Sequence, residues 1–211
     1  MKVNIIDTKN DVSVFFAAIP DNITVKQILP TEREREILSV SNERVRREKY
    51  SAWLLLEYAI KSALNITLDN AKLYKGENGK WKSELFELSI SHSGSAVAVA
   101  ISHAPVGIDL EPLGSARPAG FAKKILTEQE YNEYSALPES ERNEFLLTRW
   151  CIKEAIFKKS DSDIFVPSKT ETGVKGITKK LVSISGKEYF IAVSAEPETA
   201  VKFIDSTINP V

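Results

Sequence analysis

The fold is decided by residues 89–101, which have the sequence SISHSGSAVAVAI. A Ser-Gly turn separates two runs, so the pattern predicts strands at Ser89–Ser93 and Ala96–Ile101. In the second run a valine or isoleucine at every second position alternates with alanine. Because alternate side chains of a strand face opposite sides, the alanines predict that a neighbouring element packs closely against one face.

The flanking sequence predicts a mixture of helices and strands. Two Thr-x-x-Glu spacings, at Thr31–Glu34 and Thr127–Glu130, are typical of capping boxes at helix starts. A nearly all-round apolar segment from about Ala52 to Leu64 predicts a helix buried in the core. Further elements are predicted as a helix at Phe145–Lys159 and strands at Val12–Ala17, Val106–Leu110, Lys180–Ser185 and Glu188–Ser194.

The composition is that of an ordinary globular chain, with 211 residues of which 43% are apolar. Its 28 basic and 29 acidic side chains argue against a protein that neutralises phosphates along a nucleic acid. No run reaches the roughly 18 apolar residues of a membrane span, and Met1–Asp7 lacks a targeting pattern, so we expect a cytoplasmic protein. One cysteine, Cys151, and two histidines, His92 and His103, cannot assemble a Cys/His zinc site, so any metal must use oxygen ligands.

Two carboxylates stand two residues apart in the predicted strand Gly107-Ile108-Asp109-Leu110-Glu111. Residues two apart share one side of a strand, so Asp109 and Glu111 face one way while Ile108 and Leu110 face the core. Neighbouring negative charges need a positive partner, and a hard divalent cation such as magnesium binds carboxylates together with substrate phosphate. The alternative is a solvated strand face that carries two unrelated acids.

The predicted helix at Phe145–Lys159 carries a second group of candidates. Glu154 and Lys158 are one turn apart, and Trp150 lies one turn before Glu154 on the same side. A surface ion pair would explain the charges, but the large ring indicates that this face is turned toward another part of the protein. There Glu154 could supply a third carboxylate and Lys158 could meet a phosphate.

His92 lies in Ser91-His92-Ser93-Gly94, at the end of the first predicted strand. One interpretation is a structural histidine. The hydroxyls and the glycine around it favour a turn where backbone N–H groups and the imidazole approach an anion.

Taken together, these motifs resemble the signature set of the 4′-phosphopantetheinyl transferases. The motifs are Ser-His-Ser-Gly at 91–94, Gly-Ile-Asp-Leu-Glu at 107–111 and Trp-Cys-Ile-Lys-Glu-Ala-Ile-Phe-Lys at 150–158. The latter two match the family's Gly-hydrophobic-Asp-hydrophobic-Glu and Trp-x-x-Lys-Glu-[small]-x-x-Lys patterns at every defining position. The segment Asn78–Trp81 is similar to the family's Gly-Lys-Pro element, with Trp81 in place of the proline.

The length resembles that of the surfactin-type branch of this family, whose members are two-lobed monomers, rather than that of the shorter, trimeric holo-acyl-carrier-protein synthases. The resemblance implies an α+β fold in which two similar lobes form a pseudo-dimer. Residues 1–104 would form the lobe on the side of the coenzyme A adenine and 3′-phosphate. Residues 105–211 would form the lobe that carries magnesium and the catalytic residues, with the active site between the lobes.

The resemblance also implies the reaction. The serine hydroxyl of an acyl or peptidyl carrier protein attacks the β-phosphate of coenzyme A, the phosphopantetheine arm is transferred, and 3′,5′-adenosine bisphosphate leaves. By the family pattern Asp109, Glu111 and Glu154 hold magnesium against the pyrophosphate, and Lys158 contacts the phosphates. Glu154 is also the candidate base for the serine proton, directly or through water.

The resemblance also implies which residues bind coenzyme A. Ser91 and His92 would contact one of its phosphates, and Asp109 and Lys158 would also bind it. The 3′-phosphate needs cations in the first lobe, and among the basic residues we favour Arg47 and Lys80. The other candidates are Arg44, Arg46 and Lys49. The cluster that these residues form with Arg47 could equally be a solvated face of a helix. Replacing Asp109 or Glu111 with alanine is expected to leave the fold intact, because both would be surface groups of a cleft.

Two functions of other classes stay open at this point. One is a different magnesium-dependent phosphoryl or nucleotidyl transferase with a similar acid pair. The other is a non-catalytic module that binds a carrier protein; the complete set of three carboxylates and Lys158 speaks against it.

Overall fold

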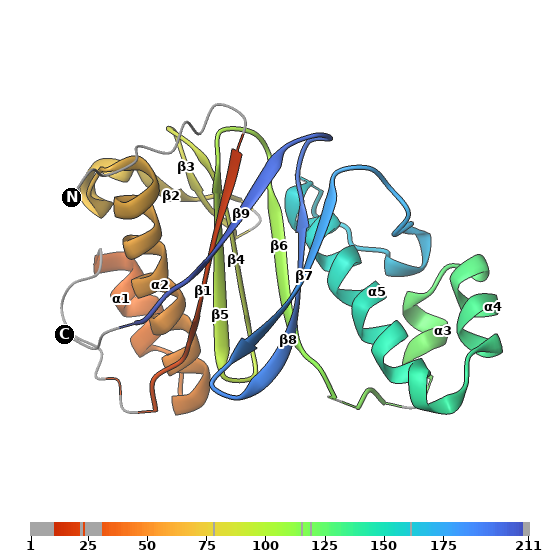
Figure 1. Cartoon of the computed structure of the whole chain (residues 1–211). Coiled ribbons are helices and arrows are strands. Elements are labelled where there is room, and N and C mark those ends of the chain that lie inside the picture. The colour runs from red at the N-terminus through yellow and green to blue at the C-terminus, as the bar shows by residue number, and fades with distance from the viewer. Residues whose placement is uncertain are drawn as a thin grey trace.

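The computed structural model describes residues 11–21, 23, 31–77, 79–114, 116–118, 120–160 and 162–208. It combines helices with sheets, so the predicted α+β fold is confirmed. Two sheets occupy the centre of the molecule and helices cover both outer sides (Figure 1). Met1–Asp7 and Asn78, which entered the predictions above, lie outside the described residues. None of the described helices is long and apolar enough to cross a membrane.

The first sheet has the strand order β4-β5-β1-β9, with β9 parallel to β1. The predicted hairpin is confirmed, because β4 pairs antiparallel with β5 around Gly94, whose φ is 63°. Every residue of β5 is buried. Its larger side chains pack in the core beneath helix α2 (Glu43–Leu64), whereas its alanines pack in a second core shared with the other sheet. The strands are β1 (Asp11–Ala18), β4 (Glu87–Ser93), β5 (Ala96–Ser102) and β9 (Ala200–Asp205).

Two helices cover the outer face of this sheet. Helix α1 (Thr31–Leu38) begins where the first capping-box spacing placed a helix start. Helix α2 (Glu43–Leu64) is capped by Asn42, whose side chain accepts a hydrogen bond from the Val45 N–H, and it ends at Leu64 as predicted. A short connection follows, made of the 3₁₀ helix η1 (Leu68–Ala71) and the two-stranded sheet of β2 (Leu73–Lys75) and β3 (Trp81–Ser83).

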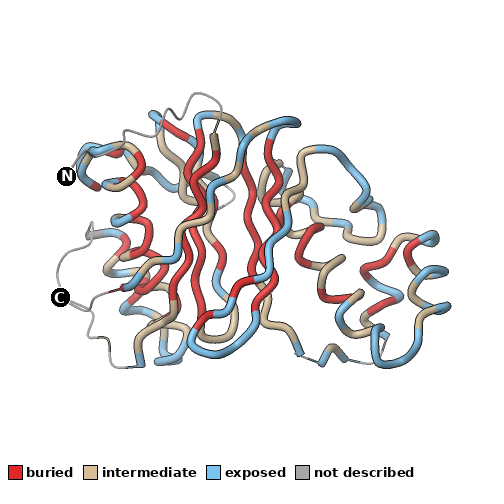
Figure 2. Tube along the Cα trace, viewed as in Figure 1, coloured by how far each residue is buried: buried red, intermediate tan, exposed pale blue. Residues whose placement is uncertain are grey.

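Helix α2 is buried on one side only. Trp53 and Leu56 are fully buried, whereas Tyr58 is 48% exposed. The prediction that this helix is buried in the core is therefore confirmed, although its outer face, with Tyr58, meets solvent. Figure 2 shows the buried residues gathered in the central strands and on the sides of the helices that face them.

The second sheet has the order β6-β8-β7 and contains the three strands predicted for this half. Each half of the chain runs from a strand through helices to a hairpin, and in each half the second hairpin strand pairs antiparallel with the first strand. Strand β9 returns from the end of the chain to the first sheet, and both sheets share one core. The division at residue 104 stays a prediction. The strands are β6 (Gly107–Pro112), β7 (Ile177–Ile184) and β8 (Lys187–Ser194).

The helices of the second half are joined by a buried ion pair. Lys153 is fully buried, and its Nζ lies 2.6 Å from Glu130 Oε2 and donates to the carbonyl oxygens of Pro167 and Thr170. Glu130 also completes the predicted capping box with Thr127. The elements joined here are α4 (Glu128–Ala136), α5 (Glu139–Lys159) and the 3₁₀ helix η2 (Pro167–Lys169); α3 (Phe121–Ile125) precedes them.

This ion pair predicts a loss of stability in acid. Burial alone would raise the pKa of Glu130, but hydrogen bonds from Lys153, Thr172 and the Thr127 backbone lower it overall. A carboxyl with a lowered folded pKa adds stability above its unfolded pKa of about 4.3, and this contribution is lost as the pH falls through the folded pKa. The free energy of unfolding, measured with urea from about pH 5 to 3, should fall less steeply in Glu130→Gln than in the wild type.

The matched control for this prediction is Glu133→Gln, since Glu133 lies on the same helix and its side chain is 44% exposed. This variant should keep the wild-type slope. Equal slopes in the wild type and Glu130→Gln would contradict the prediction.

Candidate active site

Serines of β4 face the free edge of β6. The Ile108 N–H donates to Ser89 Oγ at 3.0 Å, and the Leu110 N–H donates to Ser91 Oγ at 3.3 Å. The other edge of β6 pairs with β8. The hydroxyls therefore take the place of a neighbouring strand's carbonyl groups, and they hold the two sheets side by side at this point.

The same row of serines orients the acid pair. Ser91 Oγ donates to Asp109 Oδ1 at 2.8 Å, and Ser93 Oγ donates to Glu111 Oε2 at 3.0 Å. Both carboxylates lie on one side of β6 while the alternate side chains are in the core, as the spacing predicts. Asp109 is only 4% exposed, so the alternative of a solvated strand face is wrong. The expectation that Asp109 is a surface group is also wrong, because hydrogen bonds and an ion pair allow its burial.

Gly107, the first residue of the acid motif, lets helix α5 pack directly on β6. A Cβ atom at this position would lie 1.9 Å from the carbonyl oxygen of Ala155 and 2.4 Å from the backbone nitrogen of Lys159. Neither backbone atom can move without moving the helix. The glycine therefore allows the last turns of α5 to lie over the acid pair.

Lys158 reaches the acid pair from α5. Its Nζ donates to Asp109 Oδ1 at 2.7 Å and to Ser91 Oγ at 3.2 Å. Burial alone would lower the pKa of Lys158, but the Asp109 carboxylate outweighs this and raises it. Lys158 is therefore a positively charged group held at a buried carboxylate.

Glu154 lies one turn before Lys158 and lines the same cavity as the acid pair. Burial raises the pKa of Glu154; Lys158 opposes this shift, and the negative charges of Asp109 and Glu111 add to it. Lys158 pairs with Asp109, so the simple surface ion pair of Glu154 with Lys158 is not what the structure contains.

Trp150, one further turn back, packs against aromatic rings of two other segments. Its ring centroid lies 5.2 Å from that of Phe121 and 5.7 Å from that of Phe165. The prediction that this face of the helix meets another part of the protein is therefore confirmed.

The three carboxylates Asp109, Glu111 and Glu154 line one cavity of about 350 Å³. Asp109 Oδ2 is buried and has no hydrogen-bond partner among the described residues. In the structure Lys158 forms an ion pair with Asp109, and Arg117 forms one with Glu111. No three side chains of the described residues are already close enough together to coordinate a metal ion. Carboxylate oxygens are the donors that a hard cation such as Mg²⁺ prefers, and one of those present, Asp109 Oδ2, is buried without a partner among the described residues. To bind the cation together, the three carboxylates would have to move closer to one another.

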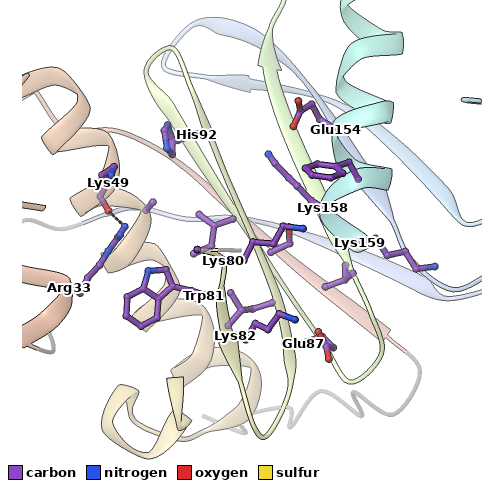
Figure 3. Close-up of a pocket in the computed structure, with 17 residues that line it drawn as sticks. Arg33, Lys49, Lys80, Trp81, Lys82, Glu87, His92, Glu154, Lys158 and Lys159 are labelled. Atoms are coloured by element: carbon purple, nitrogen blue, oxygen red, sulfur yellow. Dashed lines mark hydrogen bonds between the residues drawn. The ribbon is translucent and has the colours of Figure 1, made fainter. Parts of the chain in front are cut away.

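A second cavity, of about 380 Å³, adjoins the first and is strongly basic. Figure 3 shows its side chains converging from α1 and α2 on one side and from α5 on the other. Lys80 enters from the segment before β3, and its Nζ donates to the Ser160 carbonyl oxygen at 3.1 Å and lies 4.7 Å from the centre of the Phe157 ring. The cations that line this cavity are Arg33, Lys49, Lys80, Lys82, Lys158 and Lys159.

Arg47 does not reach this cavity. Its Nη1 donates to the Asp21 carbonyl oxygen at 2.6 Å, and it lines a separate hollow together with Arg44. Lys49, two residues further along α2, lines the basic cavity instead, and its Nζ lies 3.4 Å from Glu36 Oε1. A shift of two residues turns a helix by more than half a circle, so the two side chains leave opposite sides of it. The structure thus brings Lys49 and Lys80 to the site and leaves Arg47 out.

His92 lines both cavities. Its Nδ1 lies 3.4 Å from Glu48 Oε2. Burial lowers the pKa of His92; Glu48 opposes this, whereas the positive charges of Lys158 and Lys49 add to the lowering. A neutral imidazole at this place can still donate one N–H to an anion.

Comparison with known proteins agrees with this geometry. Residues 105–200, which include the acid pair and the Trp150–Lys158 motif, match the model of the 4′-phosphopantetheinyl transferase superfamily. A holo-[acyl-carrier-protein] synthase of Mycoplasma mobile is 31% identical over 101 residues, which are 47% of this chain and 85% of that protein. The chain belongs to the 4′-phosphopantetheinyl transferase superfamily.

Longer relatives of the superfamily also match. The 4′-phosphopantetheinyl transferase gsp of Aneurinibacillus migulanus is 26% identical over 187 residues, which are 81% of this chain and 78% of that protein. The 4′-phosphopantetheinyl transferase Sfp of Bacillus subtilis is 30% identical over 81 residues, 37% of this chain and 35% of that protein. The resemblance to the surfactin-type branch is therefore confirmed.

Arg33, which is 7% exposed on α1, lines the basic cavity and was not predicted from the sequence. Its guanidinium carbon lies 5.1 Å from the ring centre of Trp53 and 5.9 Å from that of Trp81. Trp81 stands where the superfamily pattern has proline, and its ring forms part of the basic cavity. One arginine in a charged helix carries no local signal of such a place, because the two rings come from other elements.

The close packing at Gly107 predicts that a larger residue at this position lowers the stability of the protein. Gly107→Ala should displace α5 from β6, because the added methyl group overlaps backbone of the helix. We expect a loss of about 1–3 kcal/mol in the free energy of unfolding, as for other overpacked sites, measured by urea denaturation. Gly173→Ala is the control, since a Cβ there meets nothing within 4 Å. An unchanged stability of Gly107→Ala would contradict the close approach.

Proposed function

We propose that this chain transfers the 4′-phosphopantetheine arm of coenzyme A to a serine of an acyl or peptidyl carrier protein. The observation that carries this proposal is the continuity of the basic and acidic cavities, which share Ile90, His92, Glu154 and Lys158. Coenzyme A carries a 3′-phosphate and a 5′-diphosphate on the ribose of its nucleotide. The cations of the basic cavity suit the phosphates, and the carboxylates lie where the reacting phosphate would be.

Glu154 is the residue that we propose as the base. The serine hydroxyl gives its proton to the Glu154 carboxylate, directly or through one water, while the serine oxygen forms a bond to the β-phosphorus. The position of Glu154 suits this role, because its carboxylate lines both the basic and the acidic cavity.

Lys158 is proposed to act on the leaving group. The bond from the β-phosphorus to the bridging oxygen breaks, and the electron pair stays on 3′,5′-adenosine bisphosphate. Lys158 is charged and borders both cavities, so its Nζ can stabilise this negative charge. Asp109, Glu111 and Glu154 would hold magnesium, which supplies charge neutralisation at the diphosphate when it is bound.

A single chain would be sufficient for this reaction. The basic cavity draws Lys49 from the first half of the chain and Lys158 and Lys159 from the second half. We therefore propose that the active unit is a monomer.

The direct test is intact-protein mass spectrometry of an apo carrier protein incubated with this chain, coenzyme A and magnesium. The carrier should gain the mass of one phosphopantetheine, and a chelator should abolish the gain. Asp109→Asn should lower the rate by roughly a hundredfold or more, because the amide keeps an acceptor for Lys158 but loses the negative charge.

Other outcomes of this experiment separate the competing functions. Coenzyme A binding without any mass gain across several carriers would favour the non-catalytic carrier-binding module. Absence of coenzyme A binding would favour a different phosphoryl transferase, to be identified by substrate profiling with nucleotides.

Coenzyme A affinity tests the basic cavity. Lys49→Ala should weaken coenzyme A binding by about tenfold, because it removes one phosphate-binding cation from the cavity. Arg47→Ala is the matched control on the same helix and should leave the affinity within about twofold, since Arg47 lines another hollow. Isothermal titration calorimetry measures both constants, and the reverse order of effects would refute this use of the cavity.

A further inference from the structure

Arg117 is a second, partly buried cation at the acid pair, and the superfamily motifs do not account for it. It lies in the segment between β6 and α3, and its Nη2 is 2.9 Å from Glu111 Oε2. The side chain of Arg117 is 22% exposed and that of Glu111 is 12% exposed. Its guanidinium carbon also lies 5.7 Å from the centre of the Phe121 ring. Each of the two carboxylates of β6 thus has its own cation, Lys158 at Asp109 and Arg117 at Glu111.

The two cations are held differently. Lys158 donates hydrogen bonds to Asp109 and to Ser91. Arg117 Nε and Nη2 are buried, yet neither has a hydrogen-bond partner among the described residues. The contact of Arg117 with Glu111 is therefore an attraction of charges without the directional bonds that usually fix an arginine on a carboxylate. Fewer directional bonds therefore hold Arg117 at Glu111 than hold Lys158 at Asp109.

Glu111 is also held by a residue of the first sheet. Ser93 Oγ donates to Glu111 Oε2 at 3.0 Å, independently of the arginine. Ser93 of β4 therefore orients the Glu111 carboxylate, whereas Arg117 balances its negative charge.

We propose that Arg117 is the resident counter-ion of Glu111 and that a divalent cation competes with it for this carboxylate. The proposal rests on the metal role given to the acid pair in the proposed function. Without metal, Arg117 offsets the repulsion between Asp109, Glu111 and Glu154. With metal, the same positive charge opposes the incoming cation, so Arg117 sets how much magnesium the site requires.

The competing explanation is that Arg117 orients Glu111 for the metal. The two roles predict opposite signs. If Arg117 competes, its removal strengthens metal binding, because the acids become a more negative site. If Arg117 orients Glu111, its removal weakens metal binding, because the ligand becomes mobile.

The experiment is a titration of the full chain with Mn²⁺, followed by electron paramagnetic resonance of the free ion, without coenzyme A or carrier. Arg117→Ala should bind Mn²⁺ about tenfold more tightly than the wild type, and Arg117→Lys, which keeps a charge, should lie between them. The charge-matched control is Lys175→Ala, in an exposed turn before β7, which should bind as the wild type does. Thermal unfolding of each variant establishes that the comparison is made between folded proteins.

A second measurement ties the affinity to the reaction. The magnesium concentration that gives half of the maximal transfer rate should fall in Arg117→Ala by a factor similar to the change in Mn²⁺ affinity. Lys175→Ala should again match the wild type.

Unchanged or weaker Mn²⁺ binding in Arg117→Ala would overturn the proposal, and so would absence of Mn²⁺ binding in every variant. This failure is distinguishable from failure of the proposed function. Carrier modification with unchanged metal affinity in Arg117→Ala would refute the role of Arg117 alone. Tighter Mn²⁺ binding without any carrier modification would support Arg117 as counter-ion while refuting the transferase.

Discussion

The hydroxyl of Ser91 connects the three elements that form the candidate active site. It donates to Asp109 Oδ1 and accepts from the Leu110 N–H and from Lys158 Nζ. One donor and two acceptor positions are all that a serine hydroxyl has, so its hydrogen-bonding capacity is fully used. Through this one oxygen, β4 of the first half is joined to β6 and α5 of the second half. Ser91 thereby adds a hydrogen bond from the first half to both members of the pair that Asp109 and Lys158 form in the second half.

Close packing and charge balance then act together. Gly107 brings α5 against β6, and this approach buries Lys158 together with Asp109. Buried charges of one sign would be costly, and the structure compensates them with neighbouring charges of the other sign. The same rule operates at Glu111 with Arg117, and in the outer helices at Glu130 with Lys153. An acidic cavity beside a basic one results, which suits a ligand that brings several phosphates and a divalent cation to the same place.

Features that depend on residues near each other in the chain were predictable. The alternation of alanine with larger residues in β5 predicted that one face meets a close neighbour, and the second sheet packs there. The spacing of Asp109 and Glu111 placed both carboxylates on one side of a strand. The Thr127–Glu130 spacing predicted a capping box that is present in full. In each case the period of a strand or the first turn of a helix relates neighbouring residues in a fixed way.

The site residues that the sequence did not predict depend on the packing of elements that are distant in the chain. The basic residues of α2 look alike in the sequence, but the rotation of the helix against the sheet sends Lys49 to the cavity and Arg47 to another hollow. Arg33 reaches the site because two tryptophan rings from separate elements hold it. Arg117 meets Glu111 through the course of the segment after β6. Local periodicity determines which way a side chain leaves its own strand or helix, whereas the packing of distant elements against each other determines which side chains then meet.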